Sequence, residues 1–214
     1  MLRLVYVWEF PVRLTHWVNF LAIVVLSVTG YYIASPFSQP PAGEFFYMAT
    51  MRLTHFVAAY VFTISVLVRI YWSFAGNEYS RWREFLPFWG QRRRDLMGCV
   101  YYYTFMRREC PPAVGHSASA ALSYLILLLL YLAEIGTGFA LYGQSHPRGI
   151  FWTLMGGWLL YFFHSPTLRL IHHLIMWAIL IFAIIHVYIG WLNDIAEKKF
   201  VMSSIFGGYK ADEE

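Results

Sequence analysis

The stretch LIHHLIMWAILIFAIIHVYIGWL (residues 170–192) decides the fold class of this sequence. It contains no Lys, Arg, Asp or Glu, and it is long enough to supply the roughly 20 apolar residues that cross the hydrocarbon core of a bilayer. Three further stretches have similar length and apolar character, over residues 14–34, 53–75 and 117–141. Because a membrane span must satisfy its backbone hydrogen bonds internally, each is predicted to be a helix. We therefore predict an all-α membrane protein, a four-transmembrane-helix bundle that forms a single integral-membrane domain over residues 1–214.

The composition of the whole chain favours the same class. Of the 214 residues, 59% are hydrophobic and only 13% are charged, whereas a soluble domain carries roughly 25% charged residues. A fifth apolar stretch, residues 149–163, is too short to cross a bilayer and is predicted to be an interfacial or packed segment. The two cysteines, Cys99 and Cys110, exclude a disulfide framework and an iron–sulfur cluster held by four thiolates.

The positive charges between the spans predict the topology. Twelve Lys and Arg residues lie in the N-terminal arm, the loop 76–116 and the C-terminal tail, against three in the other two connections. By the positive-inside rule, both termini and the basic loop 76–116 are cytoplasmic, and the loop 142–169 is outside. Cationic residues beside a membrane are typical of contact with membrane lipid, and we expect no nucleic-acid partner.

Histidines inside the apolar spans are the candidate functional residues. Ionisable side chains there are costly and mark function by default; this sequence has such residues at His16, His55, His172 and His186. The hexapeptide RLTHWV (13–18) recurs as RLTHFV (52–57), each at the start of a span. His172 and His186 are 14 residues apart, so they face within about 40° of each other and lie about 21 Å apart along the helix. His173 points about 100° away and is predicted to make a polar contact.

Helix direction pairs these histidines at two depths. His55 and His172 open helices that enter from outside, whereas His16 opens a helix on the cytoplasmic side, where His186 lies near a helix end. Facing pairs of neutral imidazoles in an apolar bundle are what two b-type haems with two histidine ligands each require. The alternative is four separate histidines that form hydrogen bonds between helices. His116 is the alternative inner ligand, and a zinc or copper site would need three or four ligands at one depth.

The same interval of 14 residues marks further candidates. Gly30 follows His16 at this interval and is predicted to face the outer haem, where a missing side chain admits the flat macrocycle. Gly136 and Gly138 are further candidates for that role. The alternative for these glycines is close helix packing. Arg69 follows His55 at the same interval and is predicted to pair with propionates of the inner haem. A guanidinium that reaches toward the membrane surface is the alternative for Arg69.

Taken in order along the chain, these motifs resemble those of the b-type cytochrome subunits of membrane-bound nickel–iron hydrogenases, the quinone-reactive hydrogenase cytochrome b family. The resemblance covers most of the chain, from about residue 10 to residue 210. It rests on PVR (11–13), HW (16–17), VTGY (28–31), RLTHF (52–56), RIYW (69–72), GN (76–77), YSR (79–81), GH (115–116), TGFA (137–140), HHL (172–174), MW (176–177), HVY (186–188) and GYK (208–210).

The resemblance implies a membrane anchor that passes electrons from the hydrogenase small and large subunits, outside, through haem b to menaquinone or ubiquinone. The hydrogen-activating site then lies on those partner subunits, and the chain resides in the cytoplasmic membrane of a bacterium or archaeon. The family's haem ligands correspond to His16, His55, His172 and His186. Two alternatives stay open: the cytochrome subunit of a formate dehydrogenase or related reductase, and a haem-free anchor or transporter whose histidines relay protons.

Overall fold

A computed structural model describes residues 2–36, 47–86, 88, 90–104, 106–108, 117–197 and 200–213. The chain forms two compact units, residues 9–75 and residues 1–8 with 76–214. The prediction of a single domain over the whole chain stays a prediction.

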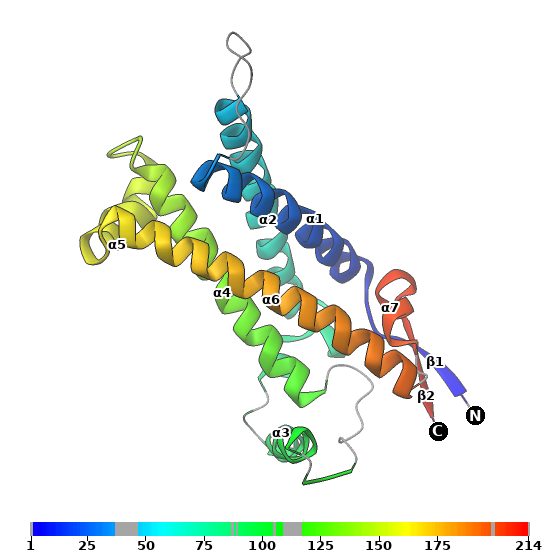
Figure 1. Cartoon of the computed structure of the whole chain (residues 1–214). Coiled ribbons are helices and arrows are strands. Elements are labelled where there is room, and N and C mark those ends of the chain that lie inside the picture. The colour runs from blue at the N-terminus through cyan, green and yellow to red at the C-terminus, as the bar shows by residue number, and fades with distance from the viewer. Residues whose placement is uncertain are drawn as a thin grey trace. The chain divides into compact units, whose positions relative to one another are not determined.

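The unit of residues 9–75 is a pair of antiparallel helices (Figure 1), α1 (Phe10–Ala34) and α2 (Tyr47–Ala75). Pro11 lies in the first turn of α1, where its missing N–H leaves no helical hydrogen bond unmade. Near this end of α1, the indole of Trp72 donates to the Glu9 carboxylate at 2.8 Å. Further along, the Ser65 hydroxyl donates to the Thr15 carbonyl at 3.4 Å. These contacts set the start of α1 beside the end of α2.

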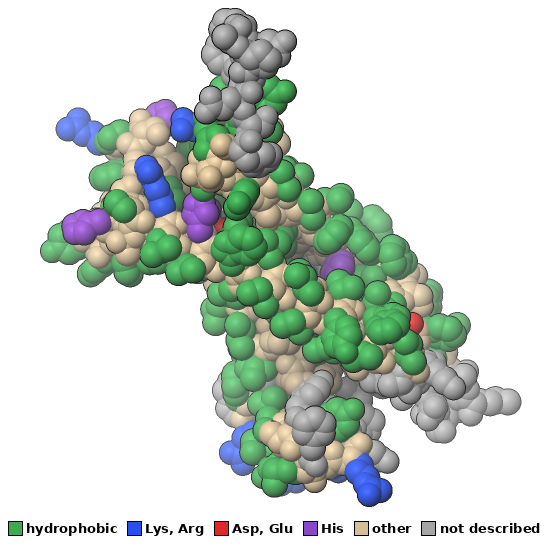
Figure 2. All heavy atoms as spheres, in the orientation of Figure 1, with side chains coloured by type: hydrophobic (Ala, Val, Ile, Leu, Met, Phe, Trp, Pro, Cys, Tyr) green, Lys and Arg blue, Asp and Glu red, His purple; other side chains and the backbone are tan. Residues whose placement is uncertain are grey.

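The other unit contains a second antiparallel pair, α4 (Ala118–Gly143) and α6 (Ser165–Glu197). Together with α1 and α2, these give four helices long and apolar enough to cross a membrane, as the sequence predicted. Only 11% to 17% of the most apolar part of each helix is buried within the protein. Hydrophobic side chains therefore cover most of the visible helix surfaces (Figure 2), as contact with lipid requires.

The fifth apolar stretch is folded against α4. It forms one π-helical turn, η3 (Trp152–Gly156), followed by the short helix α5 (Gly157–Phe162). The rings of Phe139 and Phe151 stack with centroids 4.6 Å apart, and a Cβ at Gly143 would lie only 3.0 Å from the Trp152 backbone nitrogen. This segment is too short to cross a membrane, and packing is one of the two arrangements predicted for it.

Two elements at the chain ends were not predicted. Strand β1 (Leu2–Tyr6) pairs antiparallel with β2 (Tyr209–Glu213). Between α6 and β2 lies the short helix α7 (Val201–Gly207), whose Ser204 hydroxyl accepts a buried hydrogen bond from the Trp8 indole at 3.0 Å. After α7, Gly208 adopts a left-handed φ of 91°, and a Cβ there would lie 2.6 Å from the Tyr6 ring, so only glycine fits this turn.

The basic loop 76–116 contains structure that the sequence analysis treated as a loop. It includes the short 3₁₀ turns η1 (Glu78–Ser80) and η2 (Trp82–Phe85), then the helix α3 (Gly90–Tyr103). The Asn77 side chain accepts from the Ser80 N–H at 3.0 Å and donates to the Val7 carbonyl at 3.0 Å. This asparagine therefore ties the start of the loop to the segment that follows β1.

Candidate functional site

In the unit of residues 9–75, α1 fixes the ring of His55 on α2. The Thr29 hydroxyl donates its one proton to the Val25 carbonyl at 2.7 Å, so its oxygen is an acceptor for His55 Nδ1–H at 2.9 Å. Because Nδ1 then carries the proton, the lone pair of the neutral ring is on Nε2. An imidazole in this tautomer can bind a metal through Nε2.

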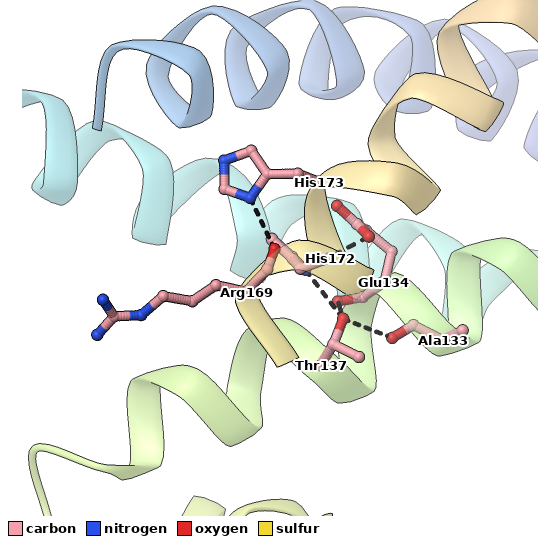
Figure 3. Close-up of polar contacts among 6 residues, drawn as sticks. All are labelled: Ala133, Glu134, Thr137, Arg169, His172 and His173. Atoms are coloured by element: carbon pink, nitrogen blue, oxygen red, sulfur yellow. Dashed lines mark hydrogen bonds and ion pairs between the residues drawn. The ribbon is translucent and has the colours of Figure 1, made fainter. Parts of the chain in front are cut away.

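The same arrangement recurs at His172 in the other unit. The Thr137 hydroxyl donates to the Ala133 carbonyl at 2.8 Å and accepts from His172 Nδ1–H at 2.9 Å. Figure 3 shows His172 on α6 directed toward Thr137 on α4. The two clusters share the dipeptide Thr-Gly, at residues 29–30 and 137–138. In each unit, therefore, a threonine hydroxyl of the neighbouring helix binds Nδ1 of one histidine, and the two imidazoles have the same tautomer.

Glycine follows each of these threonines and lies directly against the histidine ring. A Cβ at Gly30 would lie 3.2 Å from His55 Cε1, and a Cβ at Gly138 would lie 3.2 Å from His172 Cε1. Gly136, another small residue of α4, instead faces the Met155 sulfur at 3.6 Å. Gly30 and Gly138 thus let each ring rest against the neighbouring backbone, within reach of the threonine.

Glu134 is a site residue that the sequence analysis missed. Its Oε2 lies 3.3 Å from His172 Nδ1, and the exposed fractions of the two side chains are 17% and 16% (Figure 3). The position three residues before the threonine is Leu26 in α1, so the two clusters differ by this carboxyl group. The available signal was an acidic residue within an apolar span, which is costly and marks function by default.

His186 and His16 lie near the other ends of the two helix pairs. The Tyr124 hydroxyl is 3.4 Å from His186 Nδ1, and the Phe182 ring stacks on the imidazole with an interplanar angle of 10°. On α4, Tyr124 precedes Thr137 by about 20 Å of helix, so His172 and His186 are at different depths of their unit. His16 is half-buried, next to the Thr15 carbonyl that binds Ser65.

Of the remaining candidate residues, the structure describes Arg69 and His173. Arg69 is half-buried on α2, one helical turn beyond Ser65, so it lies toward the His16 end of its unit. His173 donates from Nδ1 to the Arg169 carbonyl at 2.8 Å, which confirms the predicted polar contact. His116 lies outside the described residues. The pairs His55–His172 and His16–His186 join the two units and stay predictions.

The donor chemistry of these clusters fits haem better than a bare metal ion. Haem iron needs two axial ligands, and neutral imidazole with a fixed Nδ1–H is a suitable donor. Among the residues that the structure describes, His, Cys, Asp and Glu form no group of three that would hold an isolated ion. The glycines beside His55 and His172 are positions where a Cβ would crowd the ring. The residues present therefore fit a b-type haem.

Four helices long and apolar enough to cross a membrane, with histidines near their ends, indicate a multi-pass membrane protein of the cytochrome b type. Residues 7–208 match the family described as "Prokaryotic cytochrome b561", and the chain belongs to this family. Haem b and electron transport accompany membership in a family of b-type cytochromes.

Similar proteins cover nearly the whole chain. A "Probable Ni/Fe-hydrogenase B-type cytochrome subunit" of Cupriavidus necator is 39% identical, over 98% of this chain and 88% of its own length. A protein of the same name from Rhodobacter capsulatus is 38% identical over 96% of this chain and 81% of its own. The "Probable Ni/Fe-hydrogenase 1 B-type cytochrome subunit" of Escherichia coli K12 is 37% identical over 96% and 90%. The resemblance inferred from the motifs is thereby confirmed.

Proposed function

We propose that this chain is the membrane anchor and electron-transfer subunit of a nickel–iron hydrogenase. It takes electrons from the hydrogenase small and large subunits outside and delivers them to menaquinone or ubiquinone in a bacterial or archaeal cytoplasmic membrane. The observation that carries the proposal is the pair of Thr-Gly clusters, in each of which a threonine hydroxyl lies 2.9 Å from Nδ1 of a histidine. The names of the similar proteins support a hydrogenase as partner.

We propose two haems, one held by His55 and His172 and the other by His16 and His186. On the topology predicted from the positive charges, the end of α2 and the start of α4, which the segment 76–116 joins, are both cytoplasmic. His16 and His186 belong to that side, and His55 and His172 belong to the opposite side. Haem b supplies a one-electron carrier at each level when it is bound.

The chain's own residues would do four things at these levels. Thr29 and Thr137 hold the outer imidazoles in the ligating tautomer, and Gly30 and Gly138 leave room beside the rings. Arg69, toward the His16 end of its unit, offers a guanidinium for the propionates of the inner haem. The large apolar surface of the helices keeps both levels in lipid, which limits competing reactions with water.

A haem count combined with a reduction assay tests this function. The purified chain should give two haems b per protein by pyridine haemochrome, and His173→Ala, a matched histidine on the same helix, should keep both. In membranes that contain the partner enzyme, hydrogen should reduce these haems and added quinone should reoxidise them. Absence of haem would favour a haem-free anchor or proton relay, and reduction by formate instead would favour the formate dehydrogenase alternative.

A further inference from the structure

The helix α3, within the basic segment between α2 and α4, lies where the cytoplasmic membrane surface is predicted. It packs against α4, the span that follows it. In Figure 1, α3 is seen along its axis while α4 runs across the picture, so the two helices are crosswise. A helix that lies in the plane of a membrane interface has this orientation relative to a span.

The two sides of α3 have different surroundings. Arg92 and Cys99 are seven residues apart and therefore lie on one side, within about 20° of each other. Cys99 is 1% exposed, and Arg92 pairs with the Glu84 carboxylate. Desolvation by partial burial lowers the pKa of Arg92, against a smaller opposite effect from Asp95. This side of α3 is packed and already supplied with acidic partners.

The opposite side of α3 is exposed and basic. Arg93, Met97 and Tyr101 follow at intervals of four residues, and Arg94 lies about 100° from Arg93. After the helix, the N–H groups of Met106 and Arg107 both donate to the Tyr101 carbonyl, at 2.8 and 3.0 Å. This turn brings a third arginine, Arg107, back to the same side.

Together these residues form a shallow, open pocket of about 450 Å³. It is lined by Arg93, Arg94, Met97, Gly98, Tyr101 and Arg107. Of the six lining residues that the structure describes, three carry a guanidinium and none carries a carboxylate, so this described lining is basic. Guanidinium groups recognise phosphate through charge-assisted, often bidentate hydrogen bonds. The lining therefore matches an anion of phosphate chemistry rather than an uncharged quinone.

Exposed apolar side chains lie on the same helix, and one of them, Met97, lines the pocket. Met97, Val100 and Tyr102 are exposed by 47%, 44% and 39%. A free phosphate ion would leave these side chains in water, whereas a lipid would cover them with its acyl chains. Figure 2 shows Lys or Arg and hydrophobic side chains side by side at the end of the molecule where α3 lies.

We propose that this pocket binds the phosphodiester headgroup of an anionic phospholipid of the cytoplasmic leaflet. The three guanidinium groups contact the phosphate, and the acyl chains lie along Met97 and Val100. Bound in this way, the lipid would fix α3 against the cytoplasmic end of α4. The inference goes beyond electron transfer, and it uses none of the proposed haem ligands.

Native mass spectrometry of the full-length cytochrome with phosphatidylglycerol, against phosphatidylcholine, tests the proposal. Each arginine near an anionic surface contributes enough for about a fivefold change in affinity. Arg107→Gln should weaken phosphatidylglycerol binding about fivefold, and Arg93→Gln with Arg94→Gln roughly 25-fold. Arg108→Gln is the matched control, because it removes the same charge from the neighbouring exposed residue, which does not line the pocket.

Two further experiments make the outcome decisive. Arg107→Lys should recover part of the affinity, which an unfolded variant would not do. Inorganic phosphate should compete weakly, since it lacks the acyl chains; competition at equal concentration would make the site a phosphate site and overturn the lipid proposal. Equal losses in Arg107→Gln and Arg108→Gln, or equal binding of phosphatidylcholine, would also overturn it. Because bound lipid is counted directly, failure here is distinct from failure of haem binding or electron transfer.

Discussion

At the scale of single residues, the most informative groups are the threonine hydroxyls that accept from Nδ1–H of His55 and His172. Thr29→Val and Thr137→Val keep the shape of the side chain and remove this acceptor. Loss of such a supporting hydrogen bond weakens metal affinity by roughly 10- to 100-fold. We expect each variant to lose haem from the outer level on dilution in detergent, measured by the α-band absorbance per protein. Thr63→Val is the control, because its hydroxyl donates to Ala59 in its own helix.

Glu134 makes the two outer clusters unequal. Its Oε2 lies 3.3 Å from His172 Nδ1, and a carboxyl oxygen near this N–H makes the imidazole a stronger electron donor to iron. Glu134→Gln should therefore raise the potential of the outer haem by about tens of millivolts and leave the inner haem unchanged. A redox titration that resolves both haems measures this. The reciprocal variant, Leu26→Glu, should lower the outer potential, and no change in either variant would assign Glu134 a purely structural role.

At the scale of helices, Gly136 and Gly138 give a matched test on α4. A Cβ at Gly138 would lie 3.2 Å from His172 Cε1, whereas one at Gly136 would lie 3.6 Å from the Met155 sulfur, an ordinary contact. Gly138→Ala should displace the imidazole by a few tenths of an ångström and shift the EPR g-values of the outer haem. Gly136→Ala should leave those values unchanged and stabilise the helix by about 0.5–1 kcal/mol. Equal spectra for both variants would contradict the role of Gly138.

Much of the helical framework could be predicted from hydropathy. The helix limits and elements that the prediction missed each have a physical reason. Four apolar runs predicted four spans, but α2 and α6 extend beyond the predicted limits, to Tyr47 and Glu197, because helices continue through polar residues at membrane surfaces. Strands β1 and β2 were missed because their partners lie at opposite ends of the sequence. Helix α3 was missed because its charged residues (92–95) and its apolar residues (96–103) follow one another in two blocks and give no clear helical period.

The site could be predicted only in part, because several of its contacts join different helices. His172 and His186 stood out by their interval of 14 residues, Gly30 by the same interval after His16, and His16 and His55 by the repeated hexapeptide. The threonine contacts depend on which faces of α1 and α2, or of α4 and α6, meet, and no single-helix periodicity contains that information. Glu134 had a sequence signal, an acid within an apolar span, but its partner His172 lies on another helix.

At the scale of the whole molecule, the distribution of basic residues predicts one orientation in the membrane. A reporter active only in the cytoplasm should work when fused after Glu214, and one active only outside should work when inserted near Ser145. Arg92, Arg93 and Arg94 contribute to this asymmetry, so replacing all three with Gln should reduce the bias. The opposite pattern of reporter activity would mean an inverted topology and would contradict electron transfer from an external hydrogenase.

The most direct measurement is a redox titration of the haem spectrum in four single variants, His16→Ala, His55→Ala, His172→Ala and His186→Ala. The account predicts two classes: His55→Ala and His172→Ala lose the same haem component, and His16→Ala and His186→Ala lose the other. If His16→Ala and His172→Ala instead lost the same component, the assignment of histidines to two depths would be contradicted.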